Sequence, residues 1–531
     1  MTKTVKITFL IIVLIAAFLR IYKIDVVPPS LNWDEAAGGY NAYVIANWGK
    51  DEWKASFPLV FTSFRDDKHP VHIYITAIFV KLLGLSDFTT RLPGVTIGIL
   101  SVIVIFYLAR IIFKNDLAAL FSALFLAVSP YHLHFSRGLW EVNFALFFFM
   151  LGLLLFYLVL EKRNWLINIA FLSFGLSMIS YHSSKIVVPI VALLLCVVNF
   201  KNLKASRNFY SGLFIFLIFI VLMIIDPRLL GTARAKQTQL NQEDFEKTSI
   251  YKSTKNSNLA RGEILIKNYL SHFTFQYLFL SGDQSPRNSV KVYGEFYKID
   301  TILISVGFFY LLKLKSKIKL TILLWLFLSP LPASLVAGSP SATRAVFMMG
   351  SMHLISALGA ARILQLFKSR LRVLALFIIL AILSVEVYFY LNHYFNIYPK
   401  KEPTDWQYGM RQVVEYVKDH PEYQTIYMTE ERSQPYIFFL FYLKESLPDF
   451  INTVLYNRAD SKSYKYNTVF SFNKYYFGGW DPIESYPDPD ILYILTPSQY
   501  DGLRHRAKFD VKKIIHLPDG ANTFYLVSGL R

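Results

Sequence analysis

Residues 7–24, ITFLIIVLIAAFLRIYKI, form an apolar run that follows Lys3 and Lys6. The run is close to the length of about 20 apolar residues that a helix needs to cross a bilayer. No small-x-small cleavage motif follows it, so we expect an uncleaved first membrane span and not a removed signal peptide. Similar runs recur at residues 92–112, 116–134, 140–160, 164–180, 185–200, 208–226, 299–314, 318–336, 345–361 and 371–391. The sequence therefore predicts a polytopic α-helical membrane protein with about eleven spans.

The composition agrees with a membrane protein and excludes several other classes. Hydrophobic residues make up 54% of the 531 residues and charged residues only 17%, whereas about a quarter of a typical soluble chain is charged. Cys196 is the only cysteine and lies in an apolar run. Intrachain disulfides and cysteine-based metal sites are therefore excluded.

The net charge of +18 is explained by membrane topology. Cytoplasmic loops of membrane proteins carry an excess of Lys and Arg. If the N-terminus is cytoplasmic, every loop that falls inside is short and basic. These loops contain Arg110 and Lys114; Lys162 and Arg163; Lys201, Lys204 and Arg207; Lys313, Lys315, Lys317 and Lys319; Lys368, Arg370 and Arg372. Nucleic acid is not needed to explain the charge, and we expect no nucleic-acid partner.

Residues 70–84 are apolar but short, and counting them as a span would place the later basic loops outside. We therefore expect a helix on the outer membrane surface there, and also at 35–48 and at about 262–280. The outer face then receives a first loop at 25–91 and a long loop at 227–298.

The tail that follows the last span has a different pattern. Residues 406–420 have helical periodicity, and short β-type runs follow at 424–429, 490–495, 511–516 and 523–528. We expect a transmembrane domain at 1–391 and a small extracytoplasmic α/β domain at 392–531. The tail contains no phosphate-binding glycine motif and no GxSxG, so nucleotide binding and hydrolase chemistry are not indicated.

The first outer loop contains the acidic pair Asp34-Glu35 shortly after the first span. Charge near lipid is costly unless it serves a site. An alternative interpretation is that Asp34 only caps a helix that begins at Glu35, a position that Asp favours.

Other outer segments place an Arg beside small or polar residues. These residues are Arg137, with Glu141 close by in the turn 136–141; Arg287, in the segment 281–289; and Arg344, in the segment 338–344. Arg can bind phosphate with two parallel hydrogen bonds, although each Arg alone could simply reach toward lipid headgroups.

A carboxylate and several cations on one membrane face suit transfer from a lipid-linked phosphate donor. Lys or Arg neutralises the charge that grows on the leaving phosphate. One carboxylate takes the proton from an acceptor hydroxyl as it attacks the anomeric carbon, and no second carboxylate acts as nucleophile, so inversion is expected.

The stretch LNWDEAAGGYNAY (31–43), followed by FRDDKHPVHIYITAIFVKLLGLSDFTTRLPGVTIGIL (64–100), resembles the GT-C glycosyltransferases. The stretch is similar to the protein O-mannosyltransferases and to the bacterial aminoarabinose transferases that modify lipid A. The shared features are an acidic pair just past the first span, a Lys-Pro-Pro-like triplet, an aromatic surface helix and an Arg-Leu-Pro entry into the second span. The resemblance covers residues 1–200 and continues afterwards mainly as span layout.

The resemblance implies a polyprenyl-phosphate-linked sugar donor and assigns roles to residues. Asp34 falls on the catalytic carboxylate, Glu35 on its acidic neighbour, and Lys68 on the lysine that contacts the donor phosphate. The triplet is Lys68-His69-Pro70 in place of Lys-Pro-Pro. We assign the remaining candidates to substrate binding: Asp67, Arg137, Glu141, Arg287 and Arg344.

We expect no obligatory cofactor and predict no metal site. A divalent metal is left open, because some relatives bind one and oxygen ligands are available at Glu35, Asp66, Asp67 and Glu141. Five histidines near the outer face are interpreted as packing residues: His69, His72, His132, His134 and His182.

The sequence thus predicts a multi-pass glycosyltransferase of the plasma or inner membrane, with a glycan, lipid or protein acceptor. The alternatives are an O-antigen-type polymerase or ligase, and a transporter of lipid-linked glycans. Transporters place charges near the middle of the bilayer and have repeated halves. In this chain acidic residues inside the expected spans are scarce, Glu386 being the main one, and the halves do not resemble each other.

Overall fold

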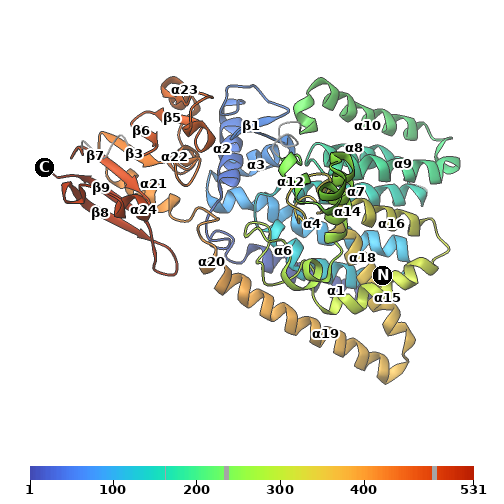
Figure 1. The fold of residues 1–531 in the computed structure, drawn as a ribbon. Coiled ribbons are helices and arrows are strands. Elements are labelled where there is room, and N and C mark those ends of the chain that lie inside the picture. The colour runs from blue at the N-terminus through green and yellow to red at the C-terminus, as the bar shows by residue number, and fades with distance from the viewer. Residues whose placement is uncertain (162, 232–237, 481–486, 531) are drawn as a thin grey trace. The chain divides into compact units, whose positions relative to one another are not determined.

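A computed structural model describes residues 1–161, 163–231, 238–480 and 487–530 (Figure 1). Residues 232–237 of the expected outer loop 227–298 lie outside this part. The chain divides into two compact units. The first comprises Met1–Tyr22, His69–His72 and Gly94–His393, and the second comprises Lys23–Lys68, Ile73–Pro93 and Tyr394–Arg531.

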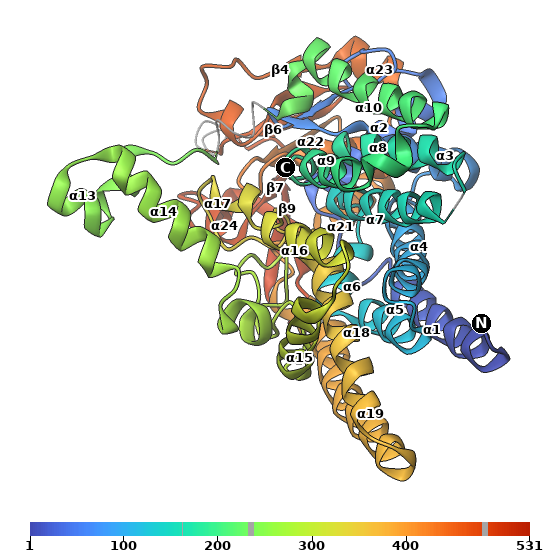
Figure 2. The same ribbon diagram turned by 90° about the vertical axis from the view of Figure 1, so that its right-hand side faces the viewer.

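The first unit is helical, and Figure 2 shows its helices from a second side. In chain order the longer helices are α1 (Lys3–Ile21), α4 (Asp87–Phe113, from Gly94 onward in this unit), α5 (Asp116–Val128), α6 (Pro130–Ser136), α7 (Glu141–Leu160), α8 (Leu166–Met178), α9 (Ser184–Leu203), α10 (Arg207–Ile225), α14 (Ser257–Ser271), α15 (Ile299–Lys313), α16 (Ile318–Leu328), α18 (Met348–Leu366) and α19 (Ser369–Asn392). Shorter pieces are η1 (Pro227–Leu230), α12 (Gln242–Glu246), α13 (Ser249–Thr254), the π-helical turn η2 (Gln276–Ser281) and α17 (Leu331–Ser334).

Several of these helices can cross a membrane. By length and hydropathy, six helices of the described residues qualify: Lys3–Ile21, Asp87–Phe113, Glu141–Leu160, Ser184–Leu203, Arg207–Ile225 and Ser369–Lys401. The pair α5 and α6, bent by 58°, would make a seventh. Other apolar helices are shorter. The chain is a mostly helical membrane protein, as predicted, and the count of about eleven spans stays a prediction.

The second unit is built on a seven-stranded sheet with the order β4-β5-β6-β3-β7-β9-β8. The strands are β3 (Thr425–Thr429), β4 (Leu455–Tyr456), β5 (Val469–Phe472), β6 (Tyr475–Gly478), β7 (Ile491–Leu495), β8 (Phe509–His516) and β9 (Asn522–Gly529). β3 is parallel to β6 and β7, and the other pairs are antiparallel. The predicted strand runs correspond to β3, β7, β8 and β9. The short strands β4, β5 and β6 were not predicted.

Helices of the tail and of the first outer loop belong to the same unit. These are α2 (Trp33–Trp48), α3 (Pro70–Leu83, from Ile73 onward in this unit), η3 (His393–Ile397, from Tyr394 onward), α20 (Tyr398–Lys401), α21 (Met410–Asp419), α22 (Pro435–Leu443), α23 (Leu447–Thr453) and α24 (Pro497–Asp501), with 3-10 turns η4 (Ser463–Lys465) and η5 (Arg506–Lys508). The outer loop also forms a hairpin of β1 (Phe61–Ser63) and β2 (Asp66–Lys68). The helix expected at 406–420 is α21, and the one expected at 35–48 is α2.

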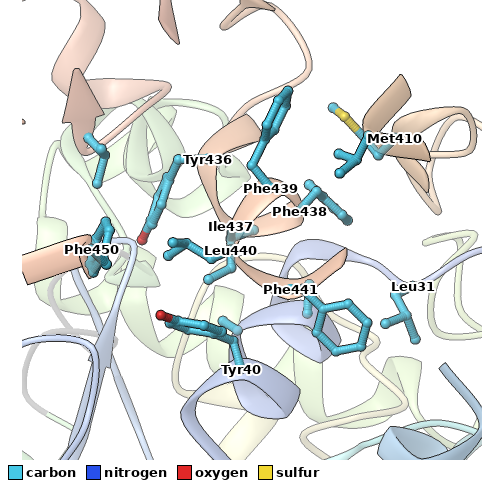
Figure 3. Close-up of a cluster of buried hydrophobic side chains, with 14 of the residues drawn as sticks. Leu31, Tyr40, Met410, Tyr436, Ile437, Phe438, Phe439, Leu440, Phe441 and Phe450 are labelled. Carbon is cyan, nitrogen blue, oxygen red and sulfur yellow. The ribbon is translucent and has the colours of Figure 1, made fainter. Parts of the chain in front are cut away.

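One hydrophobic core joins the outer loop to the tail (Figure 3). The sequence of α22, PYIFFLFYL, is apolar on every side. This suits its environment, since Pro435 through Phe441 are all buried. Tyr40 of α2 packs in the same cluster. The two helices approach closely at Gly39, where an added Cβ would lie 2.6 Å from the ring of Phe441. Because glycine has no Cβ, Gly39 allows α2 to pack closely on α22.

Glu52, in the loop after α2, is buried between the outer loop and α22. Its carboxylate accepts hydrogen bonds from Asn41 Nδ2 (3.1 Å), Ser63 Oγ (3.2 Å) and Tyr436 Oη (3.3 Å). Burial outweighs these hydrogen bonds and raises the pKa of Glu52 to about 7.

This pKa predicts a pH-dependent stability. A carboxyl group whose pKa is raised in the folded state stabilises the fold when protonated, and this stabilisation is lost as the pH rises from the unfolded pKa of about 4.5 through the folded pKa of about 7. We expect the free energy of unfolding to fall by up to about 3 kcal/mol across that window. In Glu52→Gln, which keeps an amide oxygen as acceptor, this part of the dependence should disappear. Thermal unfolding at pH 5 and pH 8 measures it, and an unchanged difference between the two pH values in Glu52→Gln would contradict the assignment.

Candidate active site

Asp34 and Lys68 form an ion pair in the first outer loop. Asp34 lies in the first turn of α2, and Lys68 is the last residue of β2. Lys68 Nζ lies 2.6 Å from Asp34 Oδ1 and 3.8 Å from Asp66 Oδ2. The side chains of Lys68 and Asp34 are 17% and 32% exposed, so an approaching ligand can reach both. Two residues that the sequence places 34 positions apart are thus brought into direct contact.

Asn32, and not Asp34, caps α2. The side-chain oxygen of Asn32 accepts from the backbone N–H groups of Asp34 (2.9 Å) and Glu35 (3.1 Å). Glu35 Oε2 in return accepts from the backbone N–H of Asn32 (3.2 Å), which completes a capping box. The interpretation of Asp34 as a helix cap is therefore wrong, and its carboxylate faces Lys68.

Glu35 pairs with Arg91. Arg91 Nε and Nη2 each donate to one oxygen of the Glu35 carboxylate at 3.0 Å, and both side chains are fully buried or nearly so. Arg91 Nη1 also donates to the carbonyl oxygens of Ile24 and Pro28, each at 2.9 Å. The pair thus ties the start of α2 to the segment that follows the first span. These contacts position Glu35, and a catalytic role for it stays a prediction.

Arg91 is not among the candidate residues of the sequence analysis, although its position carries a signal. Arg91 stands in the Arg-Leu-Pro entry to a long apolar run. A fully buried Arg at such a position requires a carboxylate or carbonyl partner, but the sequence does not distinguish Glu35 from other acidic residues of the loop such as Asp87.

The remaining candidate of this unit, Asp67, pairs with Thr62 in the β1–β2 ladder. Asp67 lies between Asp66 and Lys68. Lys68 pairs with Asp34, and Asp66 in turn contacts Lys68. Its backbone N–H donates to Asp66 Oδ1 (3.0 Å). The hairpin therefore fixes the backbone that leads to Lys68.

Glu141, at the start of α7 in the first unit, belongs to a second polar cluster. Glu141 Oε2 lies 3.4 Å from His69 Nδ1, and Oε1 lies 3.9 Å from His72 Nε2. Lys185 Nζ lies 2.7 Å from His69 Nε2 and 3.4 Å from His182 Nδ1. Glu141 and Lys185 thus lie on opposite ring nitrogens of His69. His69, His72 and His182 were interpreted as packing residues, and Lys185 was not singled out.

The three candidate arginines lie in the first unit. Arg137 is fully buried, and its Nη1 donates to the carbonyl oxygens of Leu19 (2.6 Å) and Arg20 (3.0 Å) at the end of α1, where the helix dipole favours a cation. Arg344 Nη1 donates to the carbonyl oxygen of Ala337 at 2.8 Å. The carbonyl oxygen of Arg287 contacts His134 Nε2 at 2.6 Å.

Asp283 organises the loops that carry two of these arginines, and the sequence did not indicate it. Its Oδ1 accepts from the backbone N–H of Ser285 (2.8 Å), and its Oδ2 accepts from Asn288 Nδ2 (3.1 Å) and from the backbone N–H of Ala342 (2.8 Å). The segments 281–289 and 338–344 are therefore joined. The substrate-binding roles of Arg287 and Arg344 stay predictions.

No group of three or more His, Cys, Asp or Glu side chains suited to a metal ion occurs among the described residues. Near the candidate base, the two carboxylates of Asp34 and Asp66 both face the ammonium of Lys68. A cation already occupies the position between them, so this donor set does not fit a divalent ion.

The chain folds as a mostly helical membrane protein with a C-terminal sheet domain, and its first-loop motif resembles that of the GT-C glycosyltransferases. A family model described as dolichyl-phosphate-mannose-protein mannosyltransferase matches residues 67–225. Among curated proteins, none matches the chain in sequence.

Solved structures share the fold along nearly the whole chain. ArnT from Cupriavidus metallidurans bound to undecaprenyl phosphate is similar with a TM-score of 0.60 and 11% identity over 100% of both chains. ArnT from the same organism in the apo state gives a TM-score of 0.58 and 12% identity over 99% of this chain and 97% of that one. The oligosaccharyltransferase of Archaeoglobus fulgidus, tethered to an acceptor peptide, gives a TM-score of 0.54 and 15% identity over 98% of this chain and 74% of that one. At these identities the likeness establishes the fold.

Proposed function

We propose that this protein is an integral-membrane, inverting glycosyltransferase that moves a sugar from a polyprenyl-phosphate donor to an acceptor hydroxyl on the outer face. The observation that carries the proposal is the ion pair of Asp34 and Lys68, 2.6 Å apart and open to solvent, on a chain with the GT-C fold. The ArnT structure with undecaprenyl phosphate supports a polyprenyl-phosphate donor, and the peptide-tethered oligosaccharyltransferase supports a separate acceptor.

In this proposal the two side chains divide the work. The acceptor oxygen attacks the anomeric carbon, the bond from that carbon to the phosphate oxygen breaks, and polyprenyl phosphate leaves. The acceptor proton passes to the carboxylate of Asp34. The ammonium of Lys68 stabilises the negative charge that grows on the leaving phosphate. Because Lys68 is paired with Asp34 before donor binds, a donor phosphate that attracts Lys68 also frees the carboxylate to act as base.

The membrane arrangement is part of the proposal. We infer about eleven spans, a cytoplasmic N-terminus, a catalytic domain at 1–391 and an extracytoplasmic domain at 392–531, in the plasma or inner membrane. Basic inside loops support this orientation, and the shorter apolar helices Leu166–Met178 and Ile318–Ser334 can supply spans beyond the longer ones.

Sugar release from a panel of radiolabelled polyprenyl-phosphate sugars tests the function. Purified wild-type protein with crude membrane acceptors is expected to consume at least one donor and to form a labelled product of inverted anomeric configuration. If wild-type protein consumes no donor of the panel, the proposal fails and a polymerase, ligase or transporter of lipid-linked glycans becomes the better explanation.

Chelation tests the absence of an obligatory metal. Because Lys68 already supplies the positive charge beside the candidate base, we expect the rate of sugar transfer to change less than about twofold after treatment with EDTA, since no Lewis acid is needed in addition. Loss of activity on chelation, with recovery on adding Mg²⁺ or Mn²⁺, would contradict this expectation.

A further inference from the structure

A cavity of about 240 Å³ lies in the second compact unit, where the outer loop meets helices α21 and α22. Its wall includes Asp87 from the start of α4, Arg411 and Lys418 from α21, and Lys444, which follows α22. Arg411 and Lys418 face the same side because residues seven apart on a helix lie two turns above one another. The proposed sugar transfer uses none of these residues.

The charges around the cavity leave two cations available. The guanidinium of Arg411 is held by Glu415 (Nε to Oε1, 2.7 Å) and lies 3.6 Å from Asp87 Oδ2. The two carboxylates therefore share one Arg. Lys418 and Lys444 form no ion pair with any residue in the described part of the chain, and both are exposed. The cavity wall thus carries an excess of positive charge and can receive an anion.

The chain around the cavity also presents apolar side chains to the surroundings. Leu82 and Leu83, just before the lining residues Leu85 and Ser86, are 76% and 60% exposed, and Phe88, just after Asp87, is 39% exposed. Asp87 begins α4, a helix long and apolar enough to cross a membrane. The first turn of such a helix lies near the boundary between headgroups and hydrocarbon.

We propose that this cavity binds the phosphate headgroup of an anionic membrane lipid. Lys418 and Lys444 contact the phosphate, and the exposed side chains of Leu82, Leu83 and Phe88 contact the acyl chains. Charge complementarity selects an anionic over a zwitterionic lipid, since each Lys near a membrane surface attracts anionic lipid by about 1 kcal/mol. The site stabilises the tail against the outer loop, and it does not depend on the proposed sugar transfer.

The test measures thermal unfolding of the full-length protein in detergent micelles, titrated with phosphatidylglycerol or with phosphatidylcholine. We expect phosphatidylglycerol to raise the Tm at lower concentrations than phosphatidylcholine. In the variant Lys418→Ala/Lys444→Ala the apparent affinity for phosphatidylglycerol should fall by about 10- to 30-fold. Lys418→Arg/Lys444→Arg should retain it, which separates lost charge from a folding defect.

A matched variant controls for total charge. Lys508→Ala/Lys513→Ala removes two exposed lysines of the same unit that do not line the cavity, and it should bind phosphatidylglycerol like the wild type. The proposal is overturned if the wild type does not distinguish the two lipids, or if the control variant loses as much affinity. Soluble glycerol 3-phosphate serves as a probe without acyl chains. If it raises the Tm as effectively as phosphatidylglycerol, the occupant is a free phosphate compound and not a lipid.

Discussion

Replacement of Asp34 by Asn is expected to lower the rate of sugar transfer by about 10²- to 10⁴-fold, which is the usual contribution of a general base. Asparagine has nearly the same size and can still accept a hydrogen bond from Lys68, but its amide does not take up the acceptor proton. The loss should appear in kcat. Donor binding should be retained or improved, because the ammonium of Lys68 then no longer has the Asp34 charge as its partner 2.6 Å away. Rates with a saturating polyprenyl-phosphate sugar, together with donor affinity, measure both effects.

A control variant has an ion pair of similar length. Asp510 Oδ2 lies 2.7 Å from Lys512 Nζ on β8, in the same compact unit. Asp510→Asn should transfer sugar like the wild type. If Asp34→Asn keeps a rate within threefold of the wild type, Asp34 is not the base, although the donor class is not affected by that result.

Lys68→Ala should lower the rate of sugar transfer by about 10²- to 10³-fold and also weaken donor binding, because it removes the charge that stabilises the leaving phosphate.

Replacement of Arg91 by Ala is expected to lower the free energy of unfolding by about 3–5 kcal/mol. Arg91 is fully buried, and Glu35 is 1% exposed. Removing the guanidinium leaves the Glu35 carboxylate without its bidentate partner in a site that water does not reach. It also leaves the carbonyl oxygens of Ile24 and Pro28 without a donor. Arg91→Lys should recover only part of the loss, because an ammonium does not donate in the forked geometry that the carboxylate accepts.

Arg110 in the same helix provides the comparison. Its ion pair with Asp116 is 2.6 Å long, but the side chains are 37% and 35% exposed. Arg110→Ala should therefore cost less than about 1 kcal/mol. Thermal or denaturant unfolding in detergent measures both variants. Equal losses for Arg91→Ala and Arg110→Ala would contradict the idea that burial determines the importance of the Glu35–Arg91 pair. In Glu35→Gln/Arg91→Ala both charges of the pair are removed, so this double variant should lose less than the two single variants summed.

The adjacent residues Asp34 and Glu35 show where sequence reasoning ends. The acidic pair just past the first span led to a candidate site at Asp34, and the structure brings Lys68 to the same carboxylate. The catalytic role of Asp34 stays a prediction. The catalytic role of Glu35 also stays a prediction, but helix geometry separates its contacts from those of Asp34. Successive residues of a helix point about 100° apart, so Asp34 meets the hairpin while Glu35 turns toward Arg91.

The cluster at Glu141 illustrates a second limit. Glu141 was proposed from its turn, but its contacts with His69 and the contact of Lys185 with His69 join residues that are 72 and 116 positions apart. No local pattern marks such a group, because each histidine alone is indistinguishable from a packing residue beside aromatic neighbours.

The sequence by itself determined much of the local structure of this protein, although not the short strands β4, β5 and β6. Apolar runs long enough for a bilayer specify helices, since a backbone in lipid has to satisfy its own hydrogen bonds. Alternating runs specify β3, β7, β8 and β9 for a different reason. The side chains of a strand alternate between the two faces of the sheet. Only the tertiary structure decided the partners. The core shared by the first outer loop and the tail, the ion pair of Asp34 with Lys68 and the buried pair of Glu35 with Arg91 join segments far apart in the chain. Such contacts depend on how whole faces pack and on which buried charge finds a partner, and neither is encoded in the periodicity of a single segment.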